Sequence, residues 1–204
     1  MHRIVTVGRE FGSGGREFGK RLAERLGIAY YDNEIVTAIS KKTELAESYV
    51  NQVLNNGPSV FFPITVGRTF YPQVDPAMDI NNAIYLEQSN IIREIAEKSD
   101  CVIVGRCADF ILREQKPFRV FVYAEMESKL ARCRAKAPED EHLSDRELGK
   151  RIHKIDKQRA NYYQFYTGQN WGDWLNYDLC INTSNAPIKG IVEAVAHMLE
   201  EWEN

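Results

Sequence analysis

The residues best suited to chemistry form a glycine-rich stretch that follows a short β-branched run at 4–7. Gly8 ends the run, and Gly12, Gly14 and Gly15 come soon after it. Glycine permits positive φ angles, so neighbouring amides can converge, and it has no Cβ to keep an anion away. The helical pattern after residue 15 adds unpaired amides and the positive end of a helix dipole. These features predict a phosphate-binding loop made of Gly12, Ser13, Gly14, Gly15, Arg16 and Glu17, in which Arg16 supplies the formal positive charge.

Two other interpretations of the loop compete with this one. A plain strand-to-helix turn would need fewer glycines than three in four residues. A dinucleotide-binding oxidoreductase, with Asp32 as the acid that binds ribose, would need glycine at position 17. Glu17 stands there instead, and its charge would repel a pyrophosphate. The phosphate loop is therefore favoured, and the oxidoreductase is the weakest alternative.

Two further charged residues follow later predicted strands. Asp32 comes after a run at 28–31, and Arg106 comes after a run at 101–104 and Gly105. Ligands of a parallel sheet bind beyond the carboxyl ends of the strands. Arg106 can hold a phosphate there through two hydrogen bonds, although a weak surface ion pair is the alternative.

The region 129–159 reverses the charge of the chain. It holds ten Lys or Arg residues against six Asp or Glu, while the whole chain carries a net charge of −3. The reversal predicts an anion-facing lobe, with a solvated basic face as the alternative. Arg151, Lys154, Lys157 and Arg159 lie late in this region.

Short β-branched runs alternate with longer amphipathic segments, which predicts a parallel sheet covered by helices. The predicted strands are 4–7, 28–31, 101–104, 119–123 and 179–181. The predicted helices are 16–26, 81–98, 144–163 and 187–202, and Ser144 with Glu147 forms a capping-box signal. Four of the seven prolines lie between 55 and 79, so little regular structure is expected there.

The composition fits a single α/β domain of 204 residues with a full hydrophobic core. The slightly acidic balance argues against a nucleic-acid or anionic-membrane surface. No stretch is long and apolar enough to span a membrane or to act as a secretory signal, and the four scattered cysteines fit a reduced cytoplasm. The four isolated histidines make a structural zinc site unexpected.

Aromatic residues crowd the segment 162–174. It contains Tyr162, Tyr163, Phe165, Tyr166, Trp171 and Trp174. Such density can form an internal packing unit or a homo-oligomer contact, and we favour these over a platform that stacks a nucleotide base.

The order of these segments resembles the cytidylate kinase-like family of P-loop nucleoside-monophosphate kinases. Residues 12–27 resemble the family's phosphate loop and first helix, and 28–32 its second strand. The similarity returns at 102–106, 156–159 and 176–184, in the order of the family. The resemblance implies a three-layer α/β/α P-loop fold with a core at 1–32, 99–128 and 177–204, an acceptor-binding lobe at about 33–98 and a helical lid at about 129–176.

The resemblance also implies an activity and roles for individual residues. It implies transfer of the γ-phosphoryl group of ATP, with Mg²⁺, to a nucleoside monophosphate or a similar small acceptor. Arg16, Lys157 and Arg159 would stabilise the transferred charge, and Asp32, Arg68, Arg106 and Asp109 would bind the acceptor.

The loop departs from the usual pattern G-x-x-x-x-G-K-[ST]. Arg9 replaces the first glycine, and Gly15 and Arg16 replace the lysine and the hydroxyl that normally contact the terminal phosphates and magnesium. Val104 stands where a metal-binding acid is expected, and Cys107 replaces the acid after the arginine. Ser13 is a weak candidate metal ligand, with Glu10 and Asp32 as others. The departures leave open a non-catalytic nucleotide- or anion-binding regulatory protein.

Overall fold

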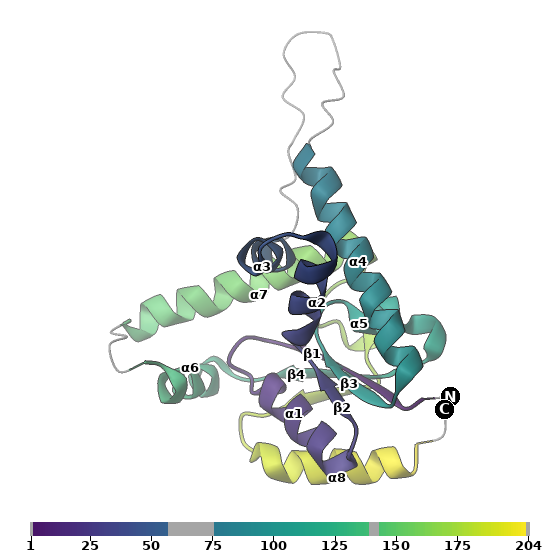
Figure 1. Cartoon of the computed structure of the whole chain (residues 1–204). Coiled ribbons are helices and arrows are strands. Elements are labelled where there is room, and N and C mark those ends of the chain that lie inside the picture. The colour runs from purple at the N-terminus through teal and green to yellow at the C-terminus, as the bar shows by residue number, and fades with distance from the viewer. Residues whose placement is uncertain (1, 57–75, 139–142, 203–204) are drawn as a thin grey trace.

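A five-stranded parallel sheet forms the centre of the molecule (Figure 1). The structure is a computed structural model, and it describes residues 2–56, 76–138 and 143–202. The strands lie in the order β2-β3-β1-β4-β5, and every pairing is parallel. Their bounds are β1 Ile4–Arg9, β2 Ala29–Tyr31, β3 Cys101–Val104, β4 Phe118–Tyr123 and β5 Leu179–Asn182. The predicted α/β fold and its parallel five-stranded sheet are confirmed.

Helices cover both faces of the sheet (Figure 1). One face is covered by α1 Gly15–Leu26 and α8 Ile188–Glu200, which pack against each other. The other helices are α2 Glu34–Thr43, α3 Glu47–Asn56, α4 Pro76–Lys98, α5 Ala108–Ile111, α6 Met126–Lys136 and α7 Asp145–Thr167. The turns Arg113–Gln115 and Trp174–Asn176 are 3₁₀ helices. Figure 1 shows α7 extending away from the sheet to meet α6 at its outer end.

Alternation along β1 divides the core into two parts. Val5 and Val7 face α1 and α8 and join a wholly hydrophobic cluster with Phe18 and Leu22. Ile4 faces the opposite way and belongs to a second cluster that takes in α2, α3, α4 and α7. Side chains alternate across a strand, so the β-branched run supplies both cores at once. We call these the α1–α8 face and the α4–α7 face.

Local signals explain where the main helices begin and end. Ser144 and Glu147 form both hydrogen bonds of the predicted capping box at the start of α7. Gly27 ends α1 in a left-handed conformation with φ 67°. The helix α4 starts earlier than its periodicity indicates, at Pro76, a residue that a first helical turn tolerates. The helices α2, α3, α5 and α6 are not among those predicted from the sequence.

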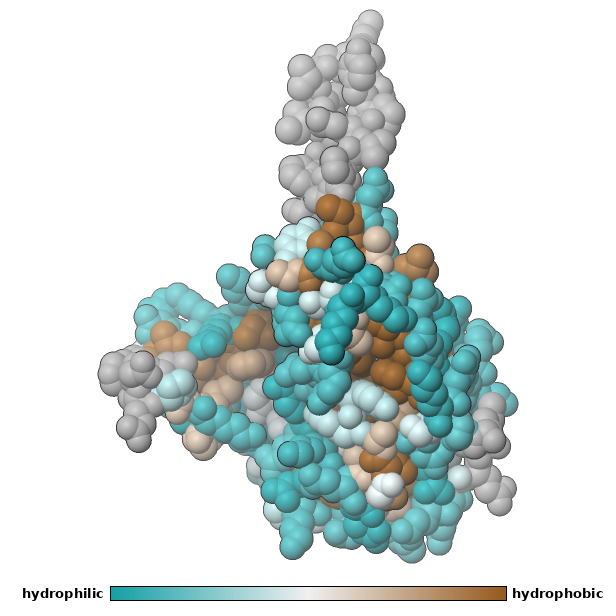
Figure 2. All heavy atoms as spheres, in the orientation of Figure 1, coloured by the Kyte–Doolittle hydropathy of each residue, from teal (hydrophilic) through white to brown (hydrophobic). Residues whose placement is uncertain are grey.

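The aromatic segment packs partly inside the molecule. Tyr162 and Tyr163 are buried, and Tyr166 stacks on Tyr85 at 4.0 Å between ring centroids. Trp174, in contrast, is 71% exposed. The surface in Figure 2 is mostly hydrophilic, with hydrophobic atoms in small patches. The predicted homo-oligomer contact through 162–174 stays a prediction. Among the described residues, no helix could cross a membrane.

Candidate functional site

The glycine loop connects β1 to α1 at the carboxyl edge of the sheet. Gly12 and Gly14 have positive φ angles of 75° and 82°, and Gly14 precedes the first helical residue. Within the part of the chain that the structure describes, the amides of Gly14, Arg16 and Glu17 donate no hydrogen bond. Unpaired amides at a helix N-terminus form a site for negative oxygens. The loop therefore has the geometry that the sequence predicts.

A cavity of about 360 Å³ opens over this loop. Its walls come from the loop, from α6 and from α7. The lining includes six basic residues, Arg9, Arg16, Arg132, Lys136, Arg151 and Arg159, against two acidic ones, Glu10 and Glu17. Such a concentration of positive charge around free amides favours a polyanionic ligand, because each cation attracts the same phosphate oxygens.

A second cavity of about 50 Å³ lies beside the first, toward the α4–α7 face. It is lined by Arg9, Leu54, Arg106, Cys107, Arg159, Tyr162, Tyr163 and Trp171. Arg106 Nε and the Tyr162 hydroxyl are buried there without a hydrogen-bond partner in the described structure. Buried polar atoms are usually satisfied, so these two indicate a ligand with hydrogen-bond acceptors. Apart from its three arginines, the wall consists of aromatic and apolar side chains.

Arg106 owes its position to an unusual turn after β3. Gly105, Arg106 and Cys107 all have positive φ angles, at 73°, 61° and 54°. Gln88 of α4 donates a hydrogen bond to the Arg106 carbonyl at 2.9 Å and so holds the turn. Burial lowers the pKa of Arg106, because the cation loses its water without gaining a close carboxylate.

Arg9 and Arg159 lie in the wall that both cavities share. Arg159 Nη1 donates a hydrogen bond to the Arg9 carbonyl at 3.1 Å. Burial, reinforced by the Arg159 charge, lowers the pKa of Arg9 to about 9. Burial also lowers the pKa of Arg159. In both arginines desolvation is the main cause of the lowered pKa and neighbouring arginines add to it, while Asp156 partly offsets it for Arg159.

Asp32 is the carboxylate nearest to the loop arginines. Its side chain is 5% exposed; Arg16 Nε lies 2.5 Å from one of its oxygens, and Arg9 Nη2 lies 3.6 Å from the other. Asp32 lines neither cavity. Asp32 therefore lies beside the arginines and outside both cavities, where it partly neutralises their charge and orients them.

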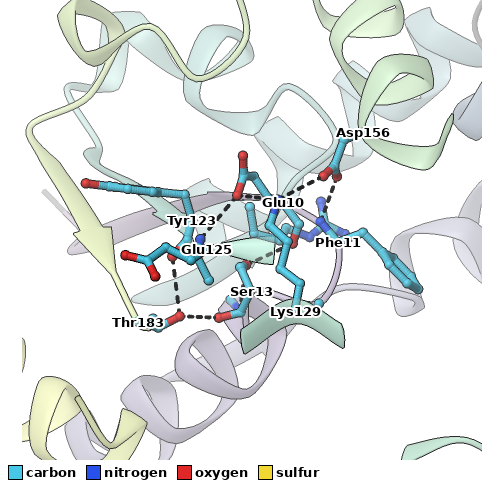
Figure 3. Close-up of polar contacts among 12 residues, drawn as sticks. Glu10, Phe11, Ser13, Tyr123, Glu125, Lys129, Asp156 and Thr183 are labelled. Atoms are coloured by element: carbon cyan, nitrogen blue, oxygen red, sulfur yellow. Dashed lines mark hydrogen bonds and ion pairs between the residues drawn. The ribbon is translucent and has the colours of Figure 1, made fainter. Parts of the chain in front are cut away.

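A second polar network ties the loop to α6 and α7 (Figure 3). Lys129 is buried and lies 2.7 Å from Glu10 and 3.4 Å from Asp156. Asp156 also accepts a hydrogen bond from the Phe11 amide at 2.7 Å. Figure 3 shows the Glu10 and Asp156 side chains converging on Lys129. Because each partner comes from a different segment, the network fixes the loop against both helices. Burial raises the pKa of Asp156.

The other end of the loop is fixed from β5 and α6. The Thr183 hydroxyl donates a hydrogen bond to the Ser13 carbonyl at 2.6 Å (Figure 3). Arg132 of α6 donates to the carbonyls of Gly12 and Thr183. The loop carbonyls therefore point into the protein, which leaves its amides for the cavity.

The predicted site residues fall into two groups. The structure brings together Gly12, Gly14, Gly15, Arg16, Glu17 and Arg159 around the larger cavity, and Arg106 lines the smaller one. Lys157 is exposed and lines neither cavity. Residues two apart on a helix point in different directions, so Lys157 and Arg159 do not act on one ligand from the same face. Arg68 lies outside the described residues.

Asp109 lies in the interior rather than in a cavity wall. It accepts a hydrogen bond from the Tyr163 hydroxyl at 2.6 Å, and burial raises its pKa. It lines neither cavity. Asp109 therefore orients Tyr163, which itself lines the smaller cavity.

The described residues do not provide a resident metal site. No group of three His, Cys, Asp or Glu side chains among them could hold an ion. The fully buried Ser13 hydroxyl donates to the Glu10 carbonyl and accepts from the Gly15 amide. Glu10 and Asp32 are paired with Lys129 and with arginines. These groups do not fit a tightly held Mg²⁺, which needs free oxygen ligands.

Sequence reasoning missed several residues of the site. Arg9 is noted there only as a replacement for glycine, and Tyr162 only as one of many aromatics. Lys129 and Asp156 have no local signal for their pairing, since 27 positions separate them. A charged residue at the end of a buried strand was the available signal for Arg9, because such a position points to the ligand edge of a parallel sheet.

Comparisons with known sequences show which family the chain resembles. The profile of the cytidylate kinase-like family matches residues 4–185. A cytidylate kinase from Archaeoglobus fulgidus is 22% identical over 198 residues, which is 96% of this chain and 94% of that protein.

Solved structures match over nearly the whole chain. An uncharacterized protein from Eubacterium ventriosum has a TM-score of 0.72 and 25% identity, covering 98% of this chain and 100% of that one. Shikimate kinase from Bacteroides thetaiotaomicron has a TM-score of 0.57 and 16% identity, covering 97% and 98%. The strand order matches that of P-loop kinase structures.

Proposed function

The chain belongs to the cytidylate kinase-like family, and from this premise we propose that it is an ATP-dependent phosphotransferase. It would move the γ-phosphoryl group of ATP to a nucleoside monophosphate or a similar small phosphate-bearing acceptor. The observation that carries the proposal is the pair of adjoining cavities whose common wall is formed by Arg9 and Arg159. A donor and an acceptor bound on either side would meet at these cations.

The larger cavity suits the donor. The free amides at the start of α1 and the Arg16 side chain would bind the phosphates of ATP. The volume of the whole cavity, about 360 Å³, suits a ligand of nucleotide size. Glu17 lies 3.0 Å from Arg21 and 3.4 Å from Lys136, so its charge is balanced where it borders the cavity.

The smaller cavity suits the phosphate of the acceptor. Arg106 and Tyr162 supply donor atoms that lack a partner within the described structure. No carboxylate lines this cavity among the described residues. A hydroxyl acceptor needs a base to remove its proton, whereas a phosphate oxygen is already an anion. The lining therefore favours an acceptor that carries phosphate. Arg68 as a further acceptor ligand stays a prediction.

Magnesium would arrive as part of the ATP complex. Mg²⁺ commonly keeps several waters and binds through substrate phosphates. The described protein groups offer it no free ligand set, so the proposal assigns it no protein ligand.

The transfer itself needs little covalent participation by the protein. The bond between the γ-phosphorus and its bridging oxygen breaks, the electron pair leaves with ADP, and an acceptor oxygen forms the new bond. Arg159 would stabilise the negative charge that spreads over the transferred group, because it borders both cavities.

The test is product formation from ATP and Mg²⁺ with a panel of acceptors. The panel contains the nucleoside monophosphates and, as a hydroxyl acceptor, shikimate. We expect one ADP per phosphorylated nucleoside monophosphate, detected by ³¹P NMR, and no shikimate phosphate. Tight ATP binding without any transfer would favour the non-catalytic regulatory protein. The loop's lack of the usual lysine and hydroxyl is the observation that supports this alternative.

Two variants of α7 locate the charge that matters. Arg159→Met should lower turnover by about a hundredfold or more, because Arg159 borders both cavities. Lys157→Met, an equal change two positions away, should lower it less than threefold. A larger loss in the Lys157 variant would restore the role that the sequence predicts for that residue and would contradict our assignment.

A further inference from the structure

Arg9 shares the most central position among the cations of the site with Arg159. Only Arg9 and Arg159, of the described residues, line both cavities. Arg9 is the last residue of β1 and leads into the glycine loop. Its side chain is 14% exposed, whereas that of Arg16 is 62% exposed. Position and burial separate the two arginines that could compensate for the missing lysine.

Two glycines give the Arg9 side chain its path. A Cβ on Gly15 would overlap Arg9 Cβ, and a Cβ on Gly105 would overlap Arg9 Nη1. Gly105 has a positive φ, but Gly15 does not, so conformational freedom does not explain the glycine at 15. The glycine at 15 is instead explained by the space that the side chains of Arg9 and Val122 occupy beside it. The side chain therefore starts against the loop and ends beside the turn that carries Arg106.

The charge of Arg9 is poorly compensated by the protein. Its nearest carboxylate among the described residues is Asp32 at 3.6 Å, and Asp32 is held more closely by Arg16 at 2.5 Å. Burial is the main cause, and Arg159 the next, of the lowered pKa of Arg9. A buried cation whose nearest carboxylate is shared with another arginine costs stability, so an anion bound against it would be strongly stabilised.

We propose that Arg9 is, beside Arg159, a catalytic cation of this site: its guanidinium contacts the phosphoryl group as that group passes from donor to acceptor. The inference rests on the proposed phosphotransferase function and assigns to Arg9 the role of the lysine that the loop lacks. Arg9 exchanges no proton; it stabilises the oxygens of the group while the bond to ADP breaks and the bond to the acceptor forms. Arg16, bound to Asp32 near the surface, binds the donor without this role.

The first test compares Arg9→Met with the matched variant Arg16→Met. Cations that stabilise a transferred phosphoryl group are worth a factor of roughly 10³ or more in kcat, so Arg9→Met should lose about a thousandfold. We expect Arg16→Met to lose less than tenfold in kcat and to raise the KM for ATP instead. A larger kcat loss in the Arg16 variant, or Arg9→Met turnover within threefold of the parent chain, would overturn the proposal.

The second test needs no turnover. Calorimetry with ATP and ADP measures how much the terminal phosphate adds to binding. We expect the preference for ATP over ADP to disappear in Arg9→Met and to persist in Arg16→Met. If the parent chain transfers no phosphoryl group, the proposed function fails, while a lost preference for ATP still supports the position of Arg9. An unchanged preference in Arg9→Met would overturn that position.

Thermal melting of the ligand-free variants distinguishes catalysis from a structural role. Removing a poorly compensated buried cation should leave the melting temperature of Arg9→Met equal to that of the parent chain or raise it. A clear fall in melting temperature with an unchanged ATP preference would make Arg9 structural and overturn the proposal. Arg9→Lys keeps the charge and serves if the methionine variant does not fold; we expect it to retain the ATP preference and part of the turnover.

Discussion

The two faces of the sheet differ in what they bury. Each face buries a hydrophobic cluster. Polar groups are also buried on and around the α4–α7 face. Among the described residues, the buried side-chain atoms without a hydrogen-bond partner are Thr6 Oγ1, Asp32 Oδ1, Gln88 Oε1, Arg106 Nε and the Tyr162 hydroxyl. None belongs to α1 or α8. Unsatisfied buried groups lower stability unless a ligand satisfies them. Both faces therefore stabilise the fold, and the α4–α7 face in addition holds buried polar groups that a bound ligand would satisfy.

The largest effect that would test this division is expected on the α1–α8 face. Leu22 is fully buried between α1 and the sheet. Leu22→Ala should lower the free energy of unfolding by about 3 kcal/mol, since it removes buried methyl groups and leaves a cavity. Urea denaturation measures the change. Lys20→Ala, on the exposed side of the same helix, should change it by less than about 0.5 kcal/mol.

The Leu22 variant should keep the affinity for ATP of the folded protein. A loss of affinity greater than the unfolded fraction explains would contradict the division, because it would couple the hydrophobic face directly to the site. A loss of unfolding free energy below about 1 kcal/mol would show that the cluster is loosely packed.

At Arg106 we expect a somewhat smaller change in free energy, and we expect it in acceptor binding rather than in unfolding. Arg106→Met removes a buried guanidinium whose Nε has no partner in the described structure. Acceptor binding should weaken roughly a hundredfold, the value of a charge-assisted hydrogen bond. The free energy of unfolding of the ligand-free protein should stay equal or rise. Titration calorimetry with the monophosphate and urea denaturation provide the two measurements.

The outcome that would contradict the Arg106 prediction is a variant that is both less stable and unchanged in acceptor binding. Arg113→Met serves as the matched control, because Arg113 lies close by in the chain, is about half exposed and lines neither cavity. It should alter neither measurement.

The same division explains how far the sequence could predict the molecule. The strands and α1 follow from β-branched runs and from leucine spacing, which depend on neighbours close in the chain. Ser144 and Glu147 fix the start of α7 by a local signal, and that prediction is confirmed. These features serve the fold, and local physics determines them.

The site depends on contacts between distant segments, and sequence reasoning reached only part of it. The glycine loop and Arg106 could be proposed because each follows a strand. The pairing of Lys129 with Asp156 and the approach of Arg9 to Gly105 exist only after folding. Lys157 and Arg159 were grouped by their shared charge, while the helical period separates them. Charge alone does not determine which side of a helix faces the ligand.

The smallest and most direct test uses two adjacent tyrosines of α7. The Tyr163 hydroxyl donates to buried Asp109 at 2.6 Å, whereas the Tyr162 hydroxyl is buried without a partner in the described structure. Tyr163→Phe should lower the free energy of unfolding by about 1–2 kcal/mol, because it removes one of the hydrogen bonds of a buried carboxylate. Tyr162→Phe should leave it unchanged or raise it slightly, and should weaken acceptor binding by less than tenfold.

The pH dependence distinguishes these two variants further. Burial raises the pKa of Asp109 above its ordinary 3.8, so its folded form holds a proton more tightly than the unfolded chain. The stability that this pKa shift adds to the folded protein is therefore fully present below pH 3.8. It is lost as the pH rises through the raised pKa of Asp109. The Tyr163 hydrogen bond favours the ionised carboxylate, so the cost of Tyr163→Phe should grow across that window and be small in acid. The Tyr162→Phe difference should not vary with pH. Equal destabilisation of both variants at neutral pH would mean that the Tyr162 hydroxyl already has a partner, and the case for an acceptor phosphate at this position would fail.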